Sequence, residues 1–242
     1  MNIIRTLYTS PALWACALLI ALALGMPLLQ PMFAQIFPEL ERPIYTQDSF
    51  LQLLLAHVFI VALSSVMSIG LGVALGVVVT QRFGRDFKPL VEAVVAMGQT
   101  FPPVAVLAIV VPLVGFGVVP ALIALSLYGL LPIVQSTIAG LDDVPISSIE
   151  AGIGSGMSPI QLFKQVQWPL ARPIVLSGIR TSVIINIGTA AVASTVGAKT
   201  LGSPIIIGLN GNNMAYVVQG AVLVAVLAVV VDLSFDALQK RT

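Results

Sequence analysis

Six long apolar runs constrain what this chain can fold into more than any other feature of its sequence. They cover approximately residues 12–29, 51–79, 90–112, 117–139, 173–196 and 214–234. A helix needs roughly 20 apolar residues to cross a bilayer, and in hydrocarbon only helices and closed barrels satisfy their backbone polar groups. With 58% hydrophobic and 9% charged residues, the composition excludes a soluble globular domain and gives no support to nucleic-acid binding. The sequence predicts an all-α integral membrane protein with about six transmembrane helices.

Two of the runs carry features beyond hydrophobicity. The second contains Gly72 and Gly76, a small-xxx-small pair that favours close packing against a neighbouring helix. The third is interrupted by Gln99-Thr100-Phe101-Pro102-Pro103, where proline removes backbone donors, so this break should face protein or water. We take Gln99, Thr100, Phe101 and Pro102, together with Asn186 in the fifth run, as candidate residues of a translocation path. The Phe101 ring suits a quaternary ammonium, with packing against neighbouring helices as the alternative.

The basic residues between the runs predict the orientation in the membrane. If both termini lie together, eight basic residues share one side, and Arg42 and Lys199 lie on the other. The eight are Arg5, Arg82, Arg85, Lys88, Lys164, Arg172, Lys240 and Arg241. This places both termini in the cytoplasm, segment 30–50 outside and the polar stretch 141–172 inside. The first run has no small-residue cleavage site after it, which favours a retained anchor. We expect residues 1–242 to form one membrane domain, with an N-terminal helix and external loop in 1–50 and a core in 51–235.

The polar stretch inside this core predicts a folded recognition element in residues 141–170. Ser147 with Glu150 has the form of a capping box, and Ser158-Pro159-Ile160-Gln161 repeats it with proline at the first helical position. Gly152, Gly154 and Gly156 between them favour the end of one short helix and a turn. We expect the second helix to stop at Trp168-Pro169.

Within this element the chain resembles the EAA loop of ABC-importer permeases. The usual form of that loop is E-A-A-x-x-x-G followed by I-x-L-P, and here Glu150-Ala151 leads to Gly156 and then to Val166-x-Trp168-Pro169. Gly152 replaces the second alanine and Trp168 replaces leucine. Stretches 98–103, 178–181, 187–190 and 196–202 are similar to the osmoprotectant permeases of the glycine betaine/choline type. The resemblance covers most of residues 50–235.

The resemblance implies a type I ABC importer permease in the bacterial inner membrane. The partners it implies are an ABC ATP-binding subunit, a periplasmic or extracellular substrate-binding protein, and a second permease subunit that is either identical or homologous. ATP and Mg²⁺ would bind to the partner ATPase, and this chain would bind no cofactor. The coupling residues it implies are Glu150, Ala151, Gly152, Gly156, Met157, Ser158, Pro159 and Pro169. A helix-start carboxylate needs no partner contact, but for Glu150 we expect both roles.

Three further polar residues lie inside or near the apolar runs. Arg180 is either a gating residue paired with Glu92 or a side chain that reaches back to the cytoplasmic interface. His57 has no second histidine or carboxylate at ligand spacing, so a hydrogen-bonded packing role is preferred to a metal site.

No motif for intrinsic catalysis is present in the sequence. Residues 193–200 faintly resemble a phosphate loop, but alanine occupies both glycine positions that the loop needs. We therefore expect a transport subunit rather than an enzyme, importing glycine betaine or a related quaternary amine. The alternatives are an ABC permease for another small solute such as an amino acid, an ion-coupled secondary transporter, or a channel.

Overall fold

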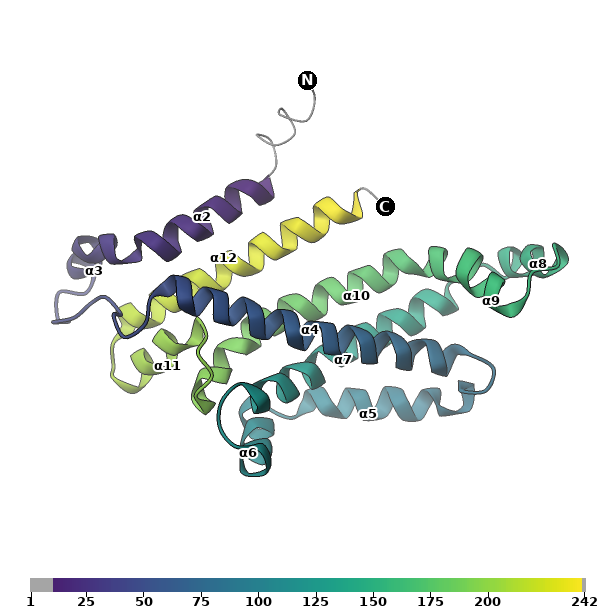
Figure 1. Cartoon of the computed structure of the whole chain (residues 1–242), viewed down its shortest axis with the longest axis horizontal. Coiled ribbons are helices and arrows are strands. Elements are labelled where there is room, and N and C mark those ends of the chain that lie inside the picture. The colour runs from purple at the N-terminus through teal and green to yellow at the C-terminus, as the bar shows by residue number, and fades with distance from the viewer. Residues whose placement is uncertain (1–10, 241–242) are drawn as a thin grey trace, which may run out of the picture. The chain divides into compact units, whose positions relative to one another are not determined.

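The computed structural model describes residues 11–240, and every regular element in that range is helical (Figure 1). Short 3₁₀ turns cover residues 26–29, 85–87 and 190–196, and a π-helical turn covers residues 163–167. The α-helices are α2 (Pro11–Gly25), α3 (Gln30–Ile36), α4 (Phe50–Thr80), α5 (Lys88–Thr100), α6 (Pro103–Val114), α7 (Val118–Asp142), α8 (Ile146–Gly154), α9 (Pro159–Leu162), α10 (Trp168–Thr189), α11 (Gly202–Asn210) and α12 (Met214–Gln239). The predicted all-α class is confirmed.

Five helical segments of the described residues are long and apolar enough to cross a membrane, and α5 with α6 makes a sixth if this broken pair counts as one span. The predicted interruption of the third run is confirmed, because α5 ends at Thr100 and α6 begins at Pro103. The first span is longer than predicted, since helical structure continues through a turn at residues 26–29 to Ile36.

The chain divides into two compact units, with divisions inside α4, α7 and α10 and one between α5 and α6. Of the described residues, one unit contains 11–63, Pro103–Leu125 and 184–240. The other contains Ser64–Pro102 and Ser126–Val183, and so holds the predicted recognition element. We call them the outer unit and the coupling unit, after the location and the role that the sequence predicts for their segments 37–49 and 141–170.

In the coupling unit, α4 packs tightly against α7 through its two glycines. A Cβ atom added at Gly72 would lie 2.8 Å from Ile133, and one added at Gly76 would lie 2.6 Å from Thr137. The predicted small-xxx-small contact is therefore confirmed. Residue 72 contacts residue 133, and residue 76 contacts residue 137, so the residue numbers increase together along both helices. These parts of α4 and α7 are therefore parallel. The chain between them has to return across the membrane, which favours counting α5 and α6 as one span and six spans in all.

The packing of α7 against α10 holds both ends of the recognition element. A Cβ atom at Gly178 would lie 1.8 Å from the Ser136 hydroxyl oxygen, and one at Gly140 would lie 2.9 Å from the Ala171 carbonyl oxygen. Residue 136 contacts residue 178, and residue 140 contacts residue 171, so the numbers increase along α7 as they decrease along α10. The two helices are therefore antiparallel. Because α7 leads into residues 143–167 and α10 follows them, this segment begins and ends on two closely packed helices.

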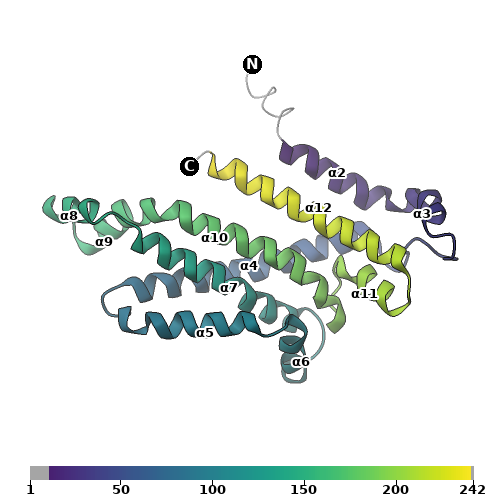
Figure 2. The ribbon, with the colours of Figure 1, turned by 180° about the vertical axis from the view of Figure 1, so that it is seen from behind.

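In the outer unit, α2 and α12 lie side by side in both views (Figures 1 and 2). The buried His57 ring links three parts of the chain, with Nε2 3.0 Å from the Ile187 carbonyl oxygen and Nδ1 accepting a hydrogen bond of 3.3 Å from the Leu201 amide. The predicted hydrogen-bonded packing role of His57 is confirmed by these two bonds.

The segment between α3 and α4 is fixed to the outer unit by polar contacts. The Gln219 side chain accepts a hydrogen bond from the Tyr45 amide (3.1 Å) and donates one to the Pro43 carbonyl oxygen (2.6 Å). The Lys199 ammonium lies 2.5 Å from a carboxylate oxygen of Asp48. This contact lowers the pKa of Asp48 against the opposing effect of partial burial.

Candidate functional site

We call residues 143–167, which make up most of the recognition element, the coupling segment. Its first half consists of the helix α8 and a glycine turn. Gly156 has a left-handed backbone with φ of +79°. Its amide donates to the Ile153 carbonyl oxygen (2.9 Å), and the Met157 amide donates to the Gly152 carbonyl oxygen (3.2 Å). These two bonds form a Schellman motif, which satisfies carbonyls that the end of a helix leaves unpaired. The predicted turn at these glycines is confirmed.

The predicted capping box of Ser147 and Glu150 is wrong. α8 begins at Ile146, one residue before Ser147, and its N-cap is Pro145, without a side-chain capping bond. The Pro145 carbonyl oxygen already accepts hydrogen bonds from the Ser148 and Ile149 amides, at 3.0 and 3.3 Å. The rigid proline therefore starts the helix in place of a hydroxyl cap.

The second capping box is confirmed, but the predicted stop after it is wrong. The Ser158 hydroxyl accepts a hydrogen bond from the Gln161 amide (3.4 Å), and the Gln161 side chain accepts one from the Ser158 amide (2.9 Å). The helix continues through the π-helical turn, in which the Trp168 amide donates to the Phe163 carbonyl oxygen. In this turn the hydrogen bond spans five residues instead of the four of an α-helix. The helix therefore continues past Pro169, although Pro169 has no N–H group to donate. Helical structure thus runs unbroken from Pro159 to Val196.

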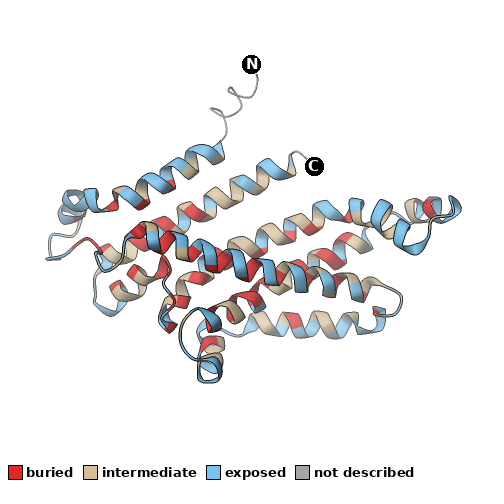
Figure 3. Ribbon diagram, in the orientation of Figure 1, coloured by how far each residue is buried: buried red, intermediate tan, exposed pale blue. Residues whose placement is uncertain are grey.

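Three exposed isoleucines and the carboxylate of Glu150 lie on the surface of the coupling segment. Ile146, Ile153 and Ile160 are 73%, 60% and 68% exposed, and Glu150 is also exposed. Much of the ribbon of this segment has the pale blue of exposed residues in Figure 3. Ile146, Glu150 and Ile153 follow helical spacing on one face of α8. Large apolar side chains exposed in a polar loop typically mark a protein interface. Sequence reasoning missed Ile146 and Ile153, although their seven-residue spacing was a visible signal.

The inner surface of α8 packs on the start of the next helix. Gly152 is buried, and a Cβ atom there would lie 2.6 Å from the Leu162 side chain. An open groove of about 440 Å³ beside this contact is lined in part by Ala151, Met157 and Pro169. Among the other predicted coupling residues, Ser158 and Pro159 are exposed, as is Gly156 in the turn. The structure thus brings all eight predicted coupling residues into one segment and its groove.

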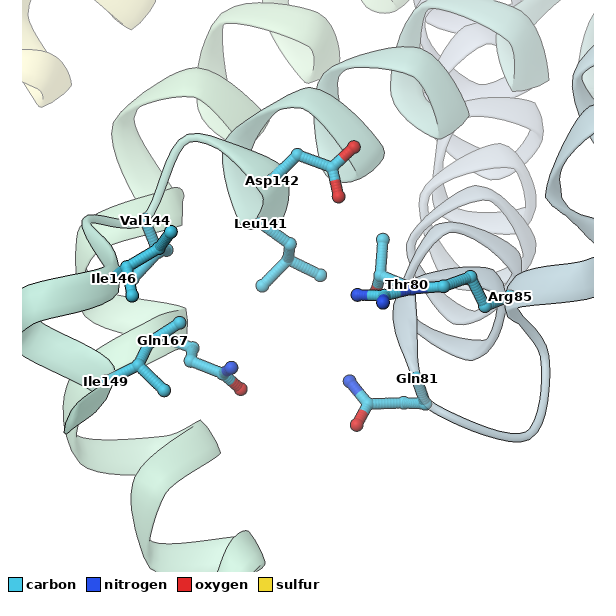
Figure 4. Close-up of a pocket in the computed structure, with 9 residues that line it drawn as sticks. All are labelled: Thr80, Gln81, Arg85, Leu141, Asp142, Val144, Ile146, Ile149 and Gln167. Atoms are coloured by element: carbon cyan, nitrogen blue, oxygen red, sulfur yellow. The ribbon is translucent and has the colours of Figure 1, made fainter. Parts of the chain in front are cut away.

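A second, smaller cavity lies between the coupling segment and the end of α4 (Figure 4). It has a volume of about 200 Å³, and the Gln81 and Gln167 side chains point toward one another across it. Beside it, the Lys88 ammonium pairs with the Asp142 carboxylate at the end of α7. A cavity of this size is below the roughly 300–1,000 Å³ typical of small-molecule sites. We therefore interpret this cavity as a packing gap where the coupling segment contacts the ends of the membrane helices.

The break between α5 and α6 is stabilised by Tyr128 of α7. The Gln99 side chain donates to the Tyr128 carbonyl oxygen (2.6 Å), and the Tyr128 hydroxyl donates to the Phe101 carbonyl oxygen. Thr100 bonds back to its own helix through the Met97 carbonyl oxygen (2.7 Å). The break was expected to face protein or water, and the Gln99 side chain and the Phe101 carbonyl group both bond to protein. Sequence reasoning missed Tyr128, because nothing along the chain links it to residues so far before it.

The remaining candidates lie in the break between α5 and α6 and on the helices α5 and α10. The Phe101 ring is 53% exposed and Pro102 is exposed, both in the coupling unit. Asn186 is buried on α10 in the outer unit. Arg180 on α10 and Glu92 on α5 are both partly buried in the coupling unit. Residues 11–240 contain no group of three or more His, Cys, Asp or Glu residues placed to hold a metal ion.

This helical architecture is shared with a solved transporter. The structure is similar to a chain of the MetNI methionine ABC transporter in an inward-facing conformation, with a TM-score of 0.70 and 21% sequence identity. The similarity covers 81% of this chain and 99% of that chain. This similarity shows that the chain has the helical fold of that transporter chain.

Residues 72–242 match the profile of the inner membrane component of binding-protein-dependent transport systems. The chain belongs to this family of multi-pass, non-catalytic ABC-importer permeases, within its osmoprotectant branch. It is similar to the choline transport system permease protein OpuBB and to the glycine betaine/carnitine/choline transport system permease protein OpuCB, both of Bacillus subtilis strain 168. Each is 40% identical over 185 residues, which are 76% of this chain and 84% of the relative. Membership of this family excludes the secondary-transporter and channel alternatives.

Proposed function

We propose that this chain forms the translocation path of an importer for a quaternary-amine osmoprotectant such as glycine betaine or choline. ATP is hydrolysed on a separate ATP-binding subunit, which holds the nucleotide and its Mg²⁺. The observation that carries the coupling role is the exposed face of Ile146, Glu150 and Ile153 on a segment anchored between two packed helices. Such a surface suits a groove on a partner protein, with apolar anchors around one charge.

The rigidity of the coupling segment supports its role in transmitting motion. Its first helix ends in a hydrogen-bonded glycine turn, and its second continues without a break into α10. Displacement of the segment by the ATPase would therefore move α10 as a lever rather than being absorbed by a loose loop. We assign the contact with the ATPase to Glu150 and its neighbours on the segment, namely Ala151, Gly152, Gly156, Met157, Ser158, Pro159 and Pro169, together with Ile146, Ile153 and Ile160.

The orientation that this function needs has both termini in the cytoplasm and segment 30–50 outside. The distribution of basic residues supports it. The ion pair of Asp48 and Lys199 also supports it, because it joins two segments that the charge count places on the same outer side. An external substrate-binding protein would deliver the substrate on that side. A second permease subunit, identical or homologous, would complete the path, with residues 1–242 acting as one permease domain.

The substrate class rests on the names of the relatives and on one aromatic ring. OpuBB is named for choline transport, and OpuCB for glycine betaine, carnitine and choline. The exposed Phe101 ring beside Gln99, Thr100 and Pro102 offers a π face to a quaternary ammonium, and Asn186 is the candidate path residue of the outer unit. An amino acid or another small solute is the second candidate for the substrate.

Coupling is tested by measuring the affinity of the purified permease for the ATP-binding subunit. Ile153→Ser should weaken binding by about 5- to 30-fold, as expected for an apolar anchor near the centre of an interface. Ile36→Ser is the matched control, since Ile36 is 58% exposed but lies on α3. Equal affinities for the wild type and both variants would contradict the assignment of this face.

Transport is tested in vesicles that contain the complete transporter and its binding protein. With ATP supplied on the ATPase side and ion gradients collapsed, labelled glycine betaine or choline should accumulate. Excess unlabelled choline should compete, whereas excess methionine should not. Uptake that competes with an amino acid instead would favour the second candidate substrate class.

Arg180 and Glu92 stay a proposed gating pair. Both lie partly buried in the coupling unit, where an unpaired charge is costly. Neutralising Glu92 alone should impair transport more than neutralising both residues together. Additive effects of Glu92→Gln and Arg180→Gln would count against a pair and favour an Arg180 side chain that reaches the interface.

A further inference from the structure

We infer that the coupling unit carries a binding groove for one anionic phospholipid, outside the translocation path and the ATPase contact. The groove lies between α4 and α10 and consists of two adjoining cavities of about 530 and 420 Å³. Both share Val73, Ala74 and Trp168 in their walls, so they form one continuous depression. We call it the α4–α10 groove.

The groove is apolar along most of its length and basic at one end. Its walls hold mainly aliphatic side chains, among them Val77 on α4 and Leu176 on α10. Lys164 and Arg172 are its charged residues, and both are exposed. Neither forms an ion pair with any residue between 11 and 240, so both ammonium and guanidinium charges are available. An apolar groove with two available cations at one end complements an acyl chain and an anionic headgroup.

Trp168 stands between the two basic residues at the position expected for the membrane interface. Lys164, Trp168 and Arg172 follow one another at intervals of four residues, which places them on one side of the helix. Tryptophan prefers the level of the lipid headgroups, and long basic side chains reach back to that level from deeper positions. The three side chains therefore mark where a lipid phosphate would lie.

The length of the groove fits one leaflet of a bilayer. On α10 it extends from Trp168 to Ile179, which corresponds to about 16 Å at a rise of about 1.5 Å per residue. Half of the roughly 30 Å hydrocarbon core is about 15 Å. An acyl chain that starts at the headgroup level of Trp168 would thus lie in the groove down to the middle of the membrane.

Gly70 keeps the groove open. A Cβ atom added there would have no atom within 4 Å, in contrast to Gly72 and Gly76 on the same helix, which contact α7. Among residues 11–240, a side chain added at Gly70 would therefore enter open space inside the groove. This offers a way to fill the groove without disturbing the packing of α4 against α7.

The test measures which lipid lies against Trp168. The chain has two tryptophans, so Trp14→Phe leaves Trp168 as its single tryptophan, which is excited selectively above the absorption band of tyrosine. The complete transporter with this change is assembled with partner subunits whose tryptophans are replaced by phenylalanine. It is placed in phosphatidylcholine vesicles that contain equal mole fractions of either bromine-labelled phosphatidylglycerol or bromine-labelled phosphatidylcholine. Bromine on the acyl chain quenches tryptophan only at close range. We expect the anionic lipid to quench Trp168 more strongly, with an association constant several times higher.

Two sets of variants separate the headgroup from the groove. Lys164→Gln and Arg172→Gln should each lower the preference for phosphatidylglycerol about fivefold, consistent with the contribution of one basic residue near an anionic membrane surface. Gly70→Leu should reduce quenching by both lipids, whereas Gly25→Leu, whose Cβ would also meet no atom within 4 Å, should leave it unchanged. Ala74→Leu gives a second filling variant if Gly70→Leu melts at a lower temperature.

Two outcomes would overturn the inference. Equal quenching by the two lipids would show that the groove has no preference for an anionic headgroup. Absence of quenching by both would show that protein covers the groove in the assembled transporter, as a second permease subunit would do. Neither outcome depends on which solute is transported, so both are distinguishable from failure of the proposed function.

Discussion

The left-handed turn at Gly156 should control how well the coupling segment docks, and its neighbour Gly154 provides a matched comparison. Both glycines are exposed, and a Cβ atom at either would meet no atom within 4 Å. They differ in backbone conformation, because Gly156 has φ of +79° and Gly154 is helical. An alanine in the left-handed region costs about 1–2 kcal/mol, whereas alanine in a helix is favoured over glycine by about 0.5–1 kcal/mol.

These free energies determine the expected change in the affinity for the ATP-binding subunit. A cost of about 1–2 kcal/mol lowers the population of the turn by about 5- to 30-fold relative to other conformations of the segment. The apparent affinity for the ATP-binding subunit falls by up to the same factor, since binding needs the turned conformation. Gly156→Ala should therefore bind the ATPase up to about 30-fold more weakly, while Gly154→Ala binds as tightly as the wild type or slightly better.

A third variant distinguishes backbone strain from a steric clash with the partner. Asparagine is larger than alanine but tolerates the left-handed region better. Gly156→Asn should therefore bind more tightly than Gly156→Ala, as measured by titration of the purified permease with the ATPase. If Gly156→Asn bound more weakly than Gly156→Ala, side-chain size would govern docking, and the reasoning from φ would be refuted.

Three other predictions concern the framework around the site. Removing the cap with Ser158→Ala should destabilise the start of the second coupling helix by about 1 kcal/mol, seen as faster amide hydrogen exchange there, and threonine should restore most of the protection. Gly178→Ala should lower the melting temperature of the purified permease by several degrees, because overpacking costs about 1–3 kcal/mol, whereas Gly188→Ala on the same helix meets no atom and should not. Because Lys199 lowers the pKa of Asp48, their contact contributes stability above the ordinary carboxyl pKa of about 3.9, and this is lost as the pH falls through the lower folded pKa. Protease digestion of segment 37–49 should accelerate at such pH in the wild type but show little of this dependence in Asp48→Asn.

The coupling segment shows which structural features could be predicted from neighbouring residues in the sequence and which could not. The glycines at 152–156 and the Ser158 capping box predicted a turn and a helix start correctly, because both structures are made by bonds between near neighbours. The two errors, a cap at Ser147 and a stop at Pro169, have a common cause. In each case a proline acted together with backbone bonds of the preceding or following turn, and residue preferences alone do not record those bonds.

By itself, the sequence determined the membrane class, the approximate positions of the spans, the break at residues 99–103 and the likeness to ABC-importer permeases. Hydrophobic length, proline and short motifs act locally, so they can be read along the chain. Only the tertiary structure decided that Tyr128 stabilises the break, that Gly178 packs on Ser136 and that Ile146 and Ile153 face outward together. These contacts join residues far apart in the chain or set the direction of a helix face, which depends on how neighbouring helices pack against one another.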